Sequence, residues 1–581
     1  MVTVFLFFSS VVRFWSAALI LAVVFSGCAS MDRQWEEPPA ANPDLEAHSA
    51  EFRRGVIEVT DGVHVAIGFG LANSILIEGE DGVIIVDTME SAEAAVPVKA
   101  AFDEITSKPV KAIIYTHFHS DHTFGATVMA GDDNPEIYAH YTTSHHLDRI
   151  VSITRDTTYR RAMRQFGVLL PPGGVVNAGI GARLLFGKDS TPGLLYPTKT
   201  YDGDRLALEI AGVRLVLIYA PGETPDQTIV WLPDKEVLLP ADNFYKSFPN
   251  LYAIRGTAYR DVTLWVKSLD IMRDLRPKYL VPHHTRPIAG EEIIYETLTN
   301  YRDAIQFVHD QTIRHMNAGY TPEEIVEKVK MPPHLAGQPY LQEYYGTVEW
   351  SVRAIFNGYL GWFGGNAADL FPLPLQERAE RFAALAGGEE NLLRHAKEAA
   401  AKGDDQWALE LADQLLRLDP EWSEAAAIRA ASLRRLGEKQ IAATARNYYL
   451  TQALEADGTL EIGTTSVNHP EFLHSVPLAA IFNSMAVNLN PEKSADVDQV
   501  MGFRFPDTKE GYTVHVRRGV AEIRPQFPED PDITVTVNSN DWKEIAAGLR
   551  NPAIAVVRDL EVEGGTINLV RFLNLFKGNE S

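Results

Sequence analysis

The sequence has almost no cysteine, since Cys28 is the only one among 581 residues. A single thiol excludes an internal disulfide framework and a Cys-rich zinc finger, so a metal site in this chain would use His, Asp and Glu. Positive charge is also scarce, because 53 Lys and Arg stand against 77 Asp and Glu, giving a formal net charge of −24. Nucleic-acid phosphates require a basic surface, so we do not expect nucleic acid as a partner.

The composition also lacks the marks of a disordered or fibrous chain. Hydrophobic residues make up 46% of it and charged residues 22%, which is typical of domains that bury a core. At ~100–200 residues per domain, the length predicts about three domains.

The amino-terminal residues 1–27 are apolar apart from a few hydroxyl groups and Arg13. An apolar run that ends in small residues is typical of a signal peptide, and Phe25-Ser26-Gly27-Cys28 resembles a bacterial lipoprotein cleavage box. We predict a signal peptide over 1–27, lipidation of Cys28 and a tether over 28–50 that need not fold. The protein would then be lipid-anchored in the bacterial cell envelope and face the periplasm. The alternatives are an uncleaved membrane anchor and an ordinary signal with an incidental cysteine.

The hydrophobic pattern after the tether predicts an α/β domain over 51–320. Short β-branched runs alternate with turns, a helical spacing covers 92–106, and a strand pattern returns at 110–116. Further strand patterns continue to residue 242. A His-rich turn that follows a strand–helix–strand pattern predicts a functional site at the carboxyl end of a strand.

Two regions without catalytic motifs follow. We predict a helical domain over 321–460, with breaks at Gly403-Asp404, Asp419-Pro420 and Gly437. The last region, 461–581, is predicted to be a small α+β domain. Its expected strands are 512–516, 520–524 and 532–538, and its expected helices are 541–549 and 567–576.

The main candidate for a functional site is the segment Thr116-His117-Phe118-His119-Ser120-Asp121-His122. Three imidazoles and a carboxylate fall within it, directly after a predicted strand. Alternate side chains of an extended segment share a face, so His117 and His119 can bind one metal, whereas Asp121 and His122 would face a second. Ligands of His and carboxylate type without thiolate suit Zn²⁺ better than Mn²⁺ or Fe.

This spacing resembles the metallo-β-lactamase superfamily, whose fold is a four-layered αββα sandwich. Other segments are similar to the bacterial alkyl sulfatases of that superfamily: 220–225 (APGETP), 250–256 (NLYAIRG), 281–284 (VPHH), 350–355 (WSVRAI), 359–362 (YLGW) and 445–450 (ARNYYL). The resemblance runs from about residue 55 to the end of the chain. It implies a helical dimerisation domain over 321–460 and a domain similar to sterol carrier proteins over 461–581.

The resemblance implies two Zn²⁺ ions per chain. The first would be held by His117, His119 and Glu223, and the second by Asp121, His122 and either His283 or His284, of which we favour His284. Asp242 would bridge both metals together with a water molecule. Most of the superfamily has His at the position of Glu223. Alkyl sulfatases typically have Glu at the position of Asp242, so this Asp is a departure that bears on metal spacing, metal preference and substrate.

The resemblance also implies how a substrate is held. A planar Arg fork suits the oxygens of a sulfate ester, and Arg255 matches the family's sulfate-binding arginine, with Asn250 as an amide donor. Gly179 and Gly181 lie where the family closes backbone over the substrate. The apolar segment 171–187 around them suits a wall or lid for an alkyl chain.

Together these expectations predict a hydrolase of alkyl sulfate esters, such as dodecyl sulfate, that forms a homodimer. Asp121, Asp242 and Arg255 would carry catalysis, whereas Asp226 is interpreted as a turn residue or a support for a ligand. One alternative is another hydrolase on the same scaffold, namely a lactonase, β-lactamase or phosphodiesterase. The other is a non-catalytic lipid- or surfactant-binding lipoprotein in which the carboxyl-terminal domain acts.

Overall fold

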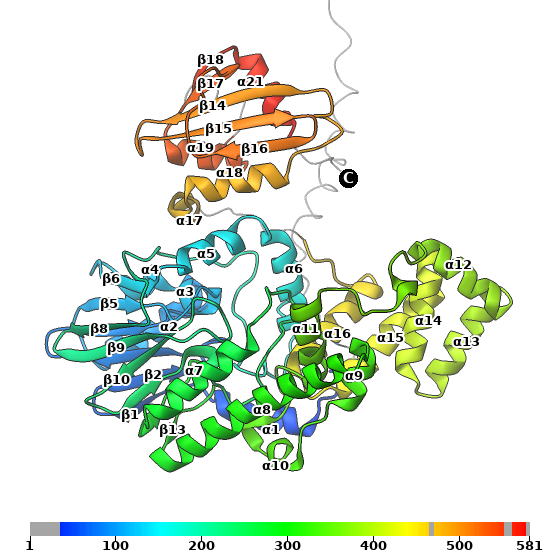
Figure 1. Cartoon of the computed structure of the whole chain (residues 1–581), viewed down its shortest axis with the longest axis horizontal. Helices are drawn as coiled ribbons and strands as arrows, with labels where there is room; N and C mark the ends of the chain where they lie inside the picture. Colours follow the sequence, from blue (N-terminus) through cyan, green and yellow to red (C-terminus); the bar gives the residue numbers. More distant parts are fainter. Residues whose placement is uncertain (1–34, 36, 464–469, 551–559, 577–581) are drawn as a thin grey trace, which may run out of the picture.

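Two β-sheets pack face to face in the amino-terminal half of the chain (Figure 1). This computed structural model describes residues 35, 37–463, 470–550 and 560–576. The first sheet follows chain order: β1 (Gly55–Thr60), β2 (Val63–Ile67), β3 (Ser74–Glu78), β4 (Val83–Val86), β5 (Val110–Ile114), β6 (Glu136–His140) and β7 (Lys199–Tyr201). Its strands pair antiparallel up to β4 and parallel from β4 to β7.

The second sheet has the order β13-β12-β11-β10-β9-β8. Its strands are β8 (Arg205–Ile210), β9 (Val213–Tyr219), β10 (Thr228–Leu232), β11 (Val237–Leu239), β12 (Tyr279–Leu280) and β13 (Ile288–Ala289). They pair antiparallel except for β11 and β12, which are parallel. Ile84 and Val86 of β4 pack against this sheet, and Ile85 between them packs on the opposite side. A strand buried on both faces therefore appears in the sequence as a continuous apolar run.

Helices cover the two outer faces. On the first sheet, α2 (Ala92–Asp103) and α4 (Ala126–Ala130) pack through residues such as Val98 and Phe102. On the second, α7 (Val262–Asp274) and α8 (Glu291–Asn317) pack through Trp265 and Leu298. The predicted αββα sandwich is confirmed.

The helical region lies to one side of the sandwich (Figure 1). It contains α9 (Pro322–Lys328), α10 (Pro333–Ala336), α11 (Val348–Leu360), α12 (Leu375–Ala386), α13 (Glu389–Ala401), α14 (Asp405–Leu418), α15 (Ser423–Lys439) and α16 (Ala443–Ala456). The expected breaks near Gly403 and Pro420 are present, but Gly437 lies inside α15. A Cβ at Gly437 would lie 3.1 Å from the Tyr449 Cβ, so this glycine allows α15 and α16 to approach closely.

The carboxyl-terminal unit is a five-stranded sheet with helices (Figure 1). Its strand order is β16-β15-β14-β17-β18, built from β14 (Asp498–Phe505), β15 (Glu510–Arg517), β16 (Val520–Arg524), β17 (Ile533–Thr536) and β18 (Glu561–Glu563). Its helices are α17 (Pro470–Ser475), α18 (Leu478–Val487), α19 (Ser539–Ala546) and α21 (Thr566–Asn574). The sheet-containing third domain is as predicted, with β14 and β18 as additional strands.

Part of the expected tether is folded, contrary to the sequence-based expectation. Residues 43–48 form α1, and Asn42 caps it by accepting from the Asp44 backbone N–H. The Arg446 guanidinium donates to the carbonyls of Pro39 and Ala40, at 3.3 and 3.2 Å. The predicted signal peptide and Cys28 lie outside the described residues. Within the described ranges, no helix is both apolar enough and long enough to span a bilayer.

Candidate metal centre and substrate cavity

The expected metal ligands lie just beyond the ends of strands from both sheets. His117 and His119 follow β5, Asp121 and His122 lie in the short α3 (Ser120–Thr123), and Glu223 follows β9. Asp242 lies in a 3-10 turn (Ala241–Asn243) after β11, and His284 follows β12. Because β5 belongs to the first sheet and the other three strands to the second, sheet packing brings these side chains together.

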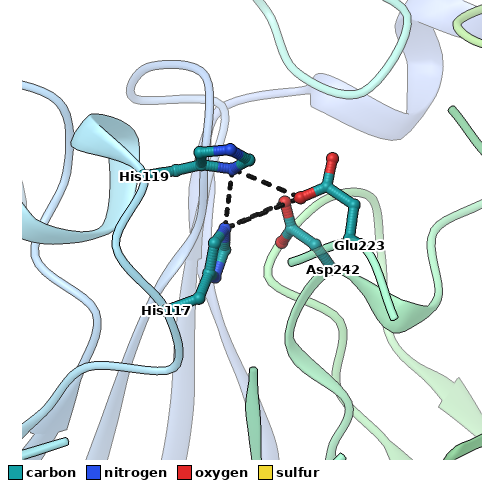
Figure 2. Close-up of side chains that lie close together, drawn as sticks. All are labelled: His117, His119, Glu223 and Asp242. Carbon is teal, nitrogen blue, oxygen red and sulfur yellow. Dashed lines mark hydrogen bonds and ion pairs between the residues drawn. The ribbon is translucent and has the colours of Figure 1, made fainter. Parts of the chain in front are cut away.

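The first group consists of His117, His119, Glu223 and Asp242, whose candidate ligand atoms lie within 4.8 Å of one another (Figure 2). His117 Nε2 is 2.9 Å from His119 Nδ1, and Glu223 Oε2 is 3.2 Å from the same His119 atom. Asp242 Oδ2 is 3.7 Å from His117 Nε2. Two nitrogens and two carboxylate oxygens at this spacing fit one divalent ion, with metal–ligand bonds of about 2.0–2.2 Å.

The second group consists of Asp121, His122 and His284, again with ligand atoms within 4.8 Å. Asp121 Oδ2 is 3.4 Å from His122 Nε2 and 3.6 Å from His284 Nε2. The neighbouring His283 belongs to neither of the described groups; its Nε2 lies 3.4 Å from Asp87 Oδ2 instead. Burial lowers the pKa of His283 to about 4.

Asp242 lies between the two groups. Its Oδ2 is 3.1 Å from His284 Nε2, and its Oδ1 is 3.5 Å from His122 Nε2, both in the second group. The same carboxylate belongs to the first group through His117. One side chain therefore contacts the ligands of both candidate metal positions.

Hydrogen bonds behind the ligands orient the imidazole rings. His122 Nδ1 donates to Asp87 Oδ2 at 2.6 Å, and His284 Nδ1 donates to the Leu71 carbonyl at 3.0 Å. In both rings the Nε2 atom is thereby left as the metal-binding atom. Asp87 also accepts from the backbone N–H and the hydroxyl of Thr116, which fixes the start of the ligand segment.

Backbone strain accompanies two ligands and one residue that orients a ligand. Asp87 has φ 59°, Ala241 before Asp242 has φ 53°, and Thr285 after His284 has φ 68°. A non-glycine residue held in this region costs about 1–3 kcal/mol, which the surrounding packing must offset. Such strain is concentrated where side chains have to be aimed, and here it lies beside both candidate metal positions.

Electrostatics keep the carboxylate ligands and His117 in metal-binding protonation states. Burial alone would raise the pKa of Glu223, but the charges of Arg260 and His119 lower it to about 2. Burial also opposes the ionisation of Asp121 and Asp242, yet nearby histidines hold both pKa values below their usual range. Burial lowers the pKa of His117 well below its ordinary value. The three carboxylates are thus ionised and His117 is neutral at neutral pH.

Three buried atoms of these groups lack a hydrogen-bond partner within the described ranges: His122 Nε2, Glu223 Oε2 and Asp242 Oδ1. A buried polar atom left unpaired costs about 1–3 kcal/mol, so such a cluster calls for a ligand. All three atoms belong to the converging groups, and divalent cations would satisfy them. The residues present therefore fit a metal centre.

A cavity of about 380 Å³ opens at the metal groups, and Asp121, Glu223 and Asp242 line it. Its apolar wall comes from α6 (Arg155–Phe166), from the segment 171–187 and from α17 of the carboxyl-terminal unit. This wall includes Met163, Phe166, Ile180, Leu184, Phe186 and Phe472. The cavity thus combines a charged end with an apolar side.

Two arginines line the cavity next to the first group. Arg255 Nη2 is 3.2 Å from His119 Nε2, while Arg255 Nη1 has no partner among the described residues. Arg260 donates to Glu223, and its Nε and Nη2 likewise have no partner there. Unpaired guanidinium N–H groups beside a metal centre are suited to binding the oxygens of an anion.

The other expected substrate-binding residues lie behind the cavity wall. Asn250 is buried, and its backbone carbonyl accepts from Arg260 Nη1. Gly181 lies against Leu71, where a Cβ would come within 2.0 Å of the Leu71 carbonyl oxygen, and Gly179 lies similarly against the Tyr344 carbonyl. Ile180, between the two glycines, is the residue that lines the cavity. Asp226 is buried outside both metal groups and accepts from the Thr143 hydroxyl at 2.8 Å.

Sequence reasoning did not find Arg260, Asp87 or Phe472. A signal existed for Arg260, which follows Arg255 by five residues in the same loop. Asp87 was not distinguishable from an ordinary turn residue, because it stands at the end of a predicted strand. Its contact with His122 forms only when β4 and β5 pair in the sheet. Phe472 lies in another domain, and no local pattern links it to the cavity.

Comparisons with known proteins agree with this arrangement. Three family models match the chain in succession: the metallo-beta-lactamase superfamily over residues 67–284, alkyl sulfatase dimerisation over 321–458 and alkyl sulfatase C-terminal over 466–580. A linear primary-alkylsulfatase of a Pseudomonas species is 39% identical over 525 residues, covering 86% of this chain and 98% of that protein. The alkyl/aryl-sulfatase BDS1 of Saccharomyces cerevisiae is 31% identical over 543 residues, covering 90% and 82%.

The same likeness extends to a solved structure. The stereoselective inverting sec-alkylsulfatase Pisa1 from Pseudomonas sp. superposes with a TM-score of 0.87 at 27% identity, covering 94% of this chain and 88% of that one. The similarity therefore spans all three units rather than the sandwich alone.

Proposed function

This chain belongs to the alkyl sulfatase family of the metallo-β-lactamase superfamily, and on that premise we propose that it is a dinuclear zinc enzyme. Its reaction would be the hydrolysis of alkyl sulfate esters, such as dodecyl sulfate, to an alcohol and inorganic sulfate. The observation that carries the proposal is the cavity in which two ligand groups sharing Asp242 meet the unpaired guanidinium of Arg255 and an apolar wall. The lactonase, phosphodiesterase and binding-protein alternatives are not favoured by the comparisons.

Zinc is proposed because the donor set of the described groups consists of imidazole nitrogen and carboxylate oxygen without thiolate. Two such ions, when bound, lower the pKa of a shared water to about 7 and hold an anionic oxygen. The protein's part is to keep Asp121, Asp242 and Glu223 ionised and the Nε2 atoms of His122 and His284 available to the metals. The Asp87 carboxylate and the Leu71 carbonyl keep these Nε2 atoms unprotonated by accepting from the Nδ1–H groups of His122 and His284.

The substrate's two ends suit the two halves of the cavity. A sulfate ester carries one negative charge spread over its oxygens, which the fork of Arg255 can bind while leaving the S–O–C link near Asp242. The alkyl chain would lie along Phe166, Leu184 and Phe472, gaining about 0.8 kcal/mol for each buried CH₂. Phe472 packs against Phe124 with ring centroids 6.0 Å apart, so the carboxyl-terminal unit takes part in this wall.

The decisive experiment measures sulfate release from dodecyl sulfate by the zinc-loaded protein, with Asp121→Ala as the matched control. We expect turnover by the wild-type protein, about two zinc ions per chain, and no release above background from the variant, because Asp121 is a ligand in the second group. Absence of release from wild-type protein that carries two metals would contradict the substrate assignment, and lactones and phosphodiesters would then be assayed.

We also propose a homodimer formed through the helical region. Between α11 and α13 the chain exposes large apolar side chains that a monomer would leave in water: Trp362 is 72% exposed, Phe371 95% and Leu385 88%. Several large apolar side chains exposed within one segment are typical of an interface. Light scattering is expected to give twice the chain mass of 64.5 kDa. The double variant Phe371→Ser and Leu385→Ser should shift the protein to monomer, and a monomeric wild-type protein would refute the proposal.

A further inference from the structure

Among the residues that the structure describes, Glu223 is the one metal-group carboxylate that is paired with an arginine. Arg260 Nη1 lies 2.6 Å from Glu223 Oε1, and both side chains are almost completely buried, with 2% and 3% of their surface exposed. The other oxygen, Oε2, is 3.2 Å from His119 Nδ1 and belongs to the first metal group. Figure 2 shows this division: one Glu223 oxygen is directed toward His119 and the second is turned away. The arginine thus holds the Glu223 oxygen that faces away from the first metal group.

Both partners are fixed from behind. The same Arg260 Nη1 donates to the Asn250 carbonyl at 2.5 Å, and the next residue, Asp261, caps α7 by accepting from the backbone N–H groups of Thr263 and Leu264. On the other side, the Glu223 backbone N–H donates to Asn243 Oδ1 at 3.3 Å. The guanidinium cannot reorient without breaking its contact with Asn250, and the other contacts hold the backbone on either side of the pair.

The pair also balances charge at the first metal position. Asp121, Glu223 and Asp242 place three buried negative charges around two candidate cations, and the substrate proposed above is itself an anion. A carboxylate removed from water and lacking a partner is costly, whereas a hydrogen-bonded pair is tolerated. Arg260 is the guanidinium that directly contacts one of these carboxylates within the described ranges.

We propose that Arg260 is a positioning residue that holds Glu223 in a single-oxygen binding mode, with Oε2 toward the metal, and offsets its charge. Arg260 thereby acts on metal affinity through Glu223 and not through a contact of its own with the metal. The inference rests on the proposed metal centre, but it does not depend on which ester the enzyme hydrolyses.

A double-mutant cycle on zinc affinity, measured by competition with a chromophoric chelator, tests the proposal. We expect Arg260→Met to weaken zinc binding at one of the two sites by about 10–100-fold, as loss of a ligand's orienting partner does. Glu223→Gln should weaken it further, and adding Arg260→Met to Glu223→Gln should change the affinity little, because the charge to be held is gone. Arg260→Lys should recover part of the loss.

The control is Arg164→Met, which removes an arginine paired with Glu455 away from the metal groups and should leave zinc affinity unchanged. Circular dichroism of the metal-free variants reports whether each is folded. Wild-type zinc affinity in Arg260→Met would overturn the proposal, and so would losses that simply add in the double variant. If sulfate release is absent in every variant but the zinc cycle is coupled, the positioning role stands and only the substrate assignment fails.

Discussion

Replacing Asp242 by asparagine is expected to lower sulfate release by about 10³-fold or more and to reduce the zinc content below two per chain. The reason is that this carboxylate contacts ligands of both groups, at 3.1 Å from His284 Nε2 and 3.7 Å from His117 Nε2. Asparagine keeps the shape but removes the charge that both cations would share, so binding and reactivity fall together.

Zinc content by atomic emission and initial rates on dodecyl sulfate check this expectation. Asp226→Asn is the matched control, since Asp226 is equally buried but belongs to neither metal group. Two zinc ions should be retained in Asp226→Asn, because Asp226 supplies no ligand atom to either group. Full zinc occupancy in Asp242→Asn would show that this residue is not shared between the metals.

Replacing Arg255 by methionine is expected to lower kcat/KM for dodecyl sulfate by about 10²–10³-fold, equivalent to about 2.7–4 kcal/mol. Arg255 presents an unpaired Nη1 in the cavity, and methionine offers no donor to the sulfate oxygens. Zinc content should stay near that of the wild type, because Arg255 is not a member of either ligand group.

Steady-state kinetics at two salt concentrations distinguish a specific contact from general attraction. Arg149, which also lines the cavity but is exposed, supplies the control, and Arg149→Met should change kcat/KM only a few-fold, since exposed charges are screened. Equal losses from the two variants, both abolished by salt, would mean that Arg255 attracts the anion without binding it.

Local patterns predicted the strands that are buried on both faces. The run ending in Asp87 reads as a strand because Ile84, Ile85 and Val86 are all covered, two by the second sheet and one by helices. The pattern failed for β14, where Gly502 interrupts the apolar residues. In the structure the Phe527 ring occupies the space that a Cβ at Gly502 would need, so the glycine serves a tertiary contact that local propensity does not encode.

Glycine and proline led to incorrect predictions of local structure at two other places, again because tertiary contacts decide their role. Gly437 was interpreted as a helix break but serves the close approach of α15 and α16. The Pro-rich stretch before residue 50 was interpreted as a free tether, yet Pro39 and Ala40 accept hydrogen bonds from Arg446, which lies about 400 residues further along the chain. Hydrogen bonds between residues so distant in sequence cannot be predicted from local composition.

The sequence by itself determined that the site binds metal through imidazole and carboxylate groups. His117, His119, Asp121 and His122 lie so close in sequence that one turn after a strand brings them together. The resemblance to alkyl sulfatases named the distant groups that complete the site, but only the tertiary structure brings them together. Glu223, Asp242 and His284 arrive from the ends of three strands of the second sheet, and only the packing of the two sheets makes them neighbours of the first four. The direction of the side chains places His284, and not His283, in the second metal group. Arg260 pairs with Glu223 because ion pairs depend on distance in space and not on separation along the chain.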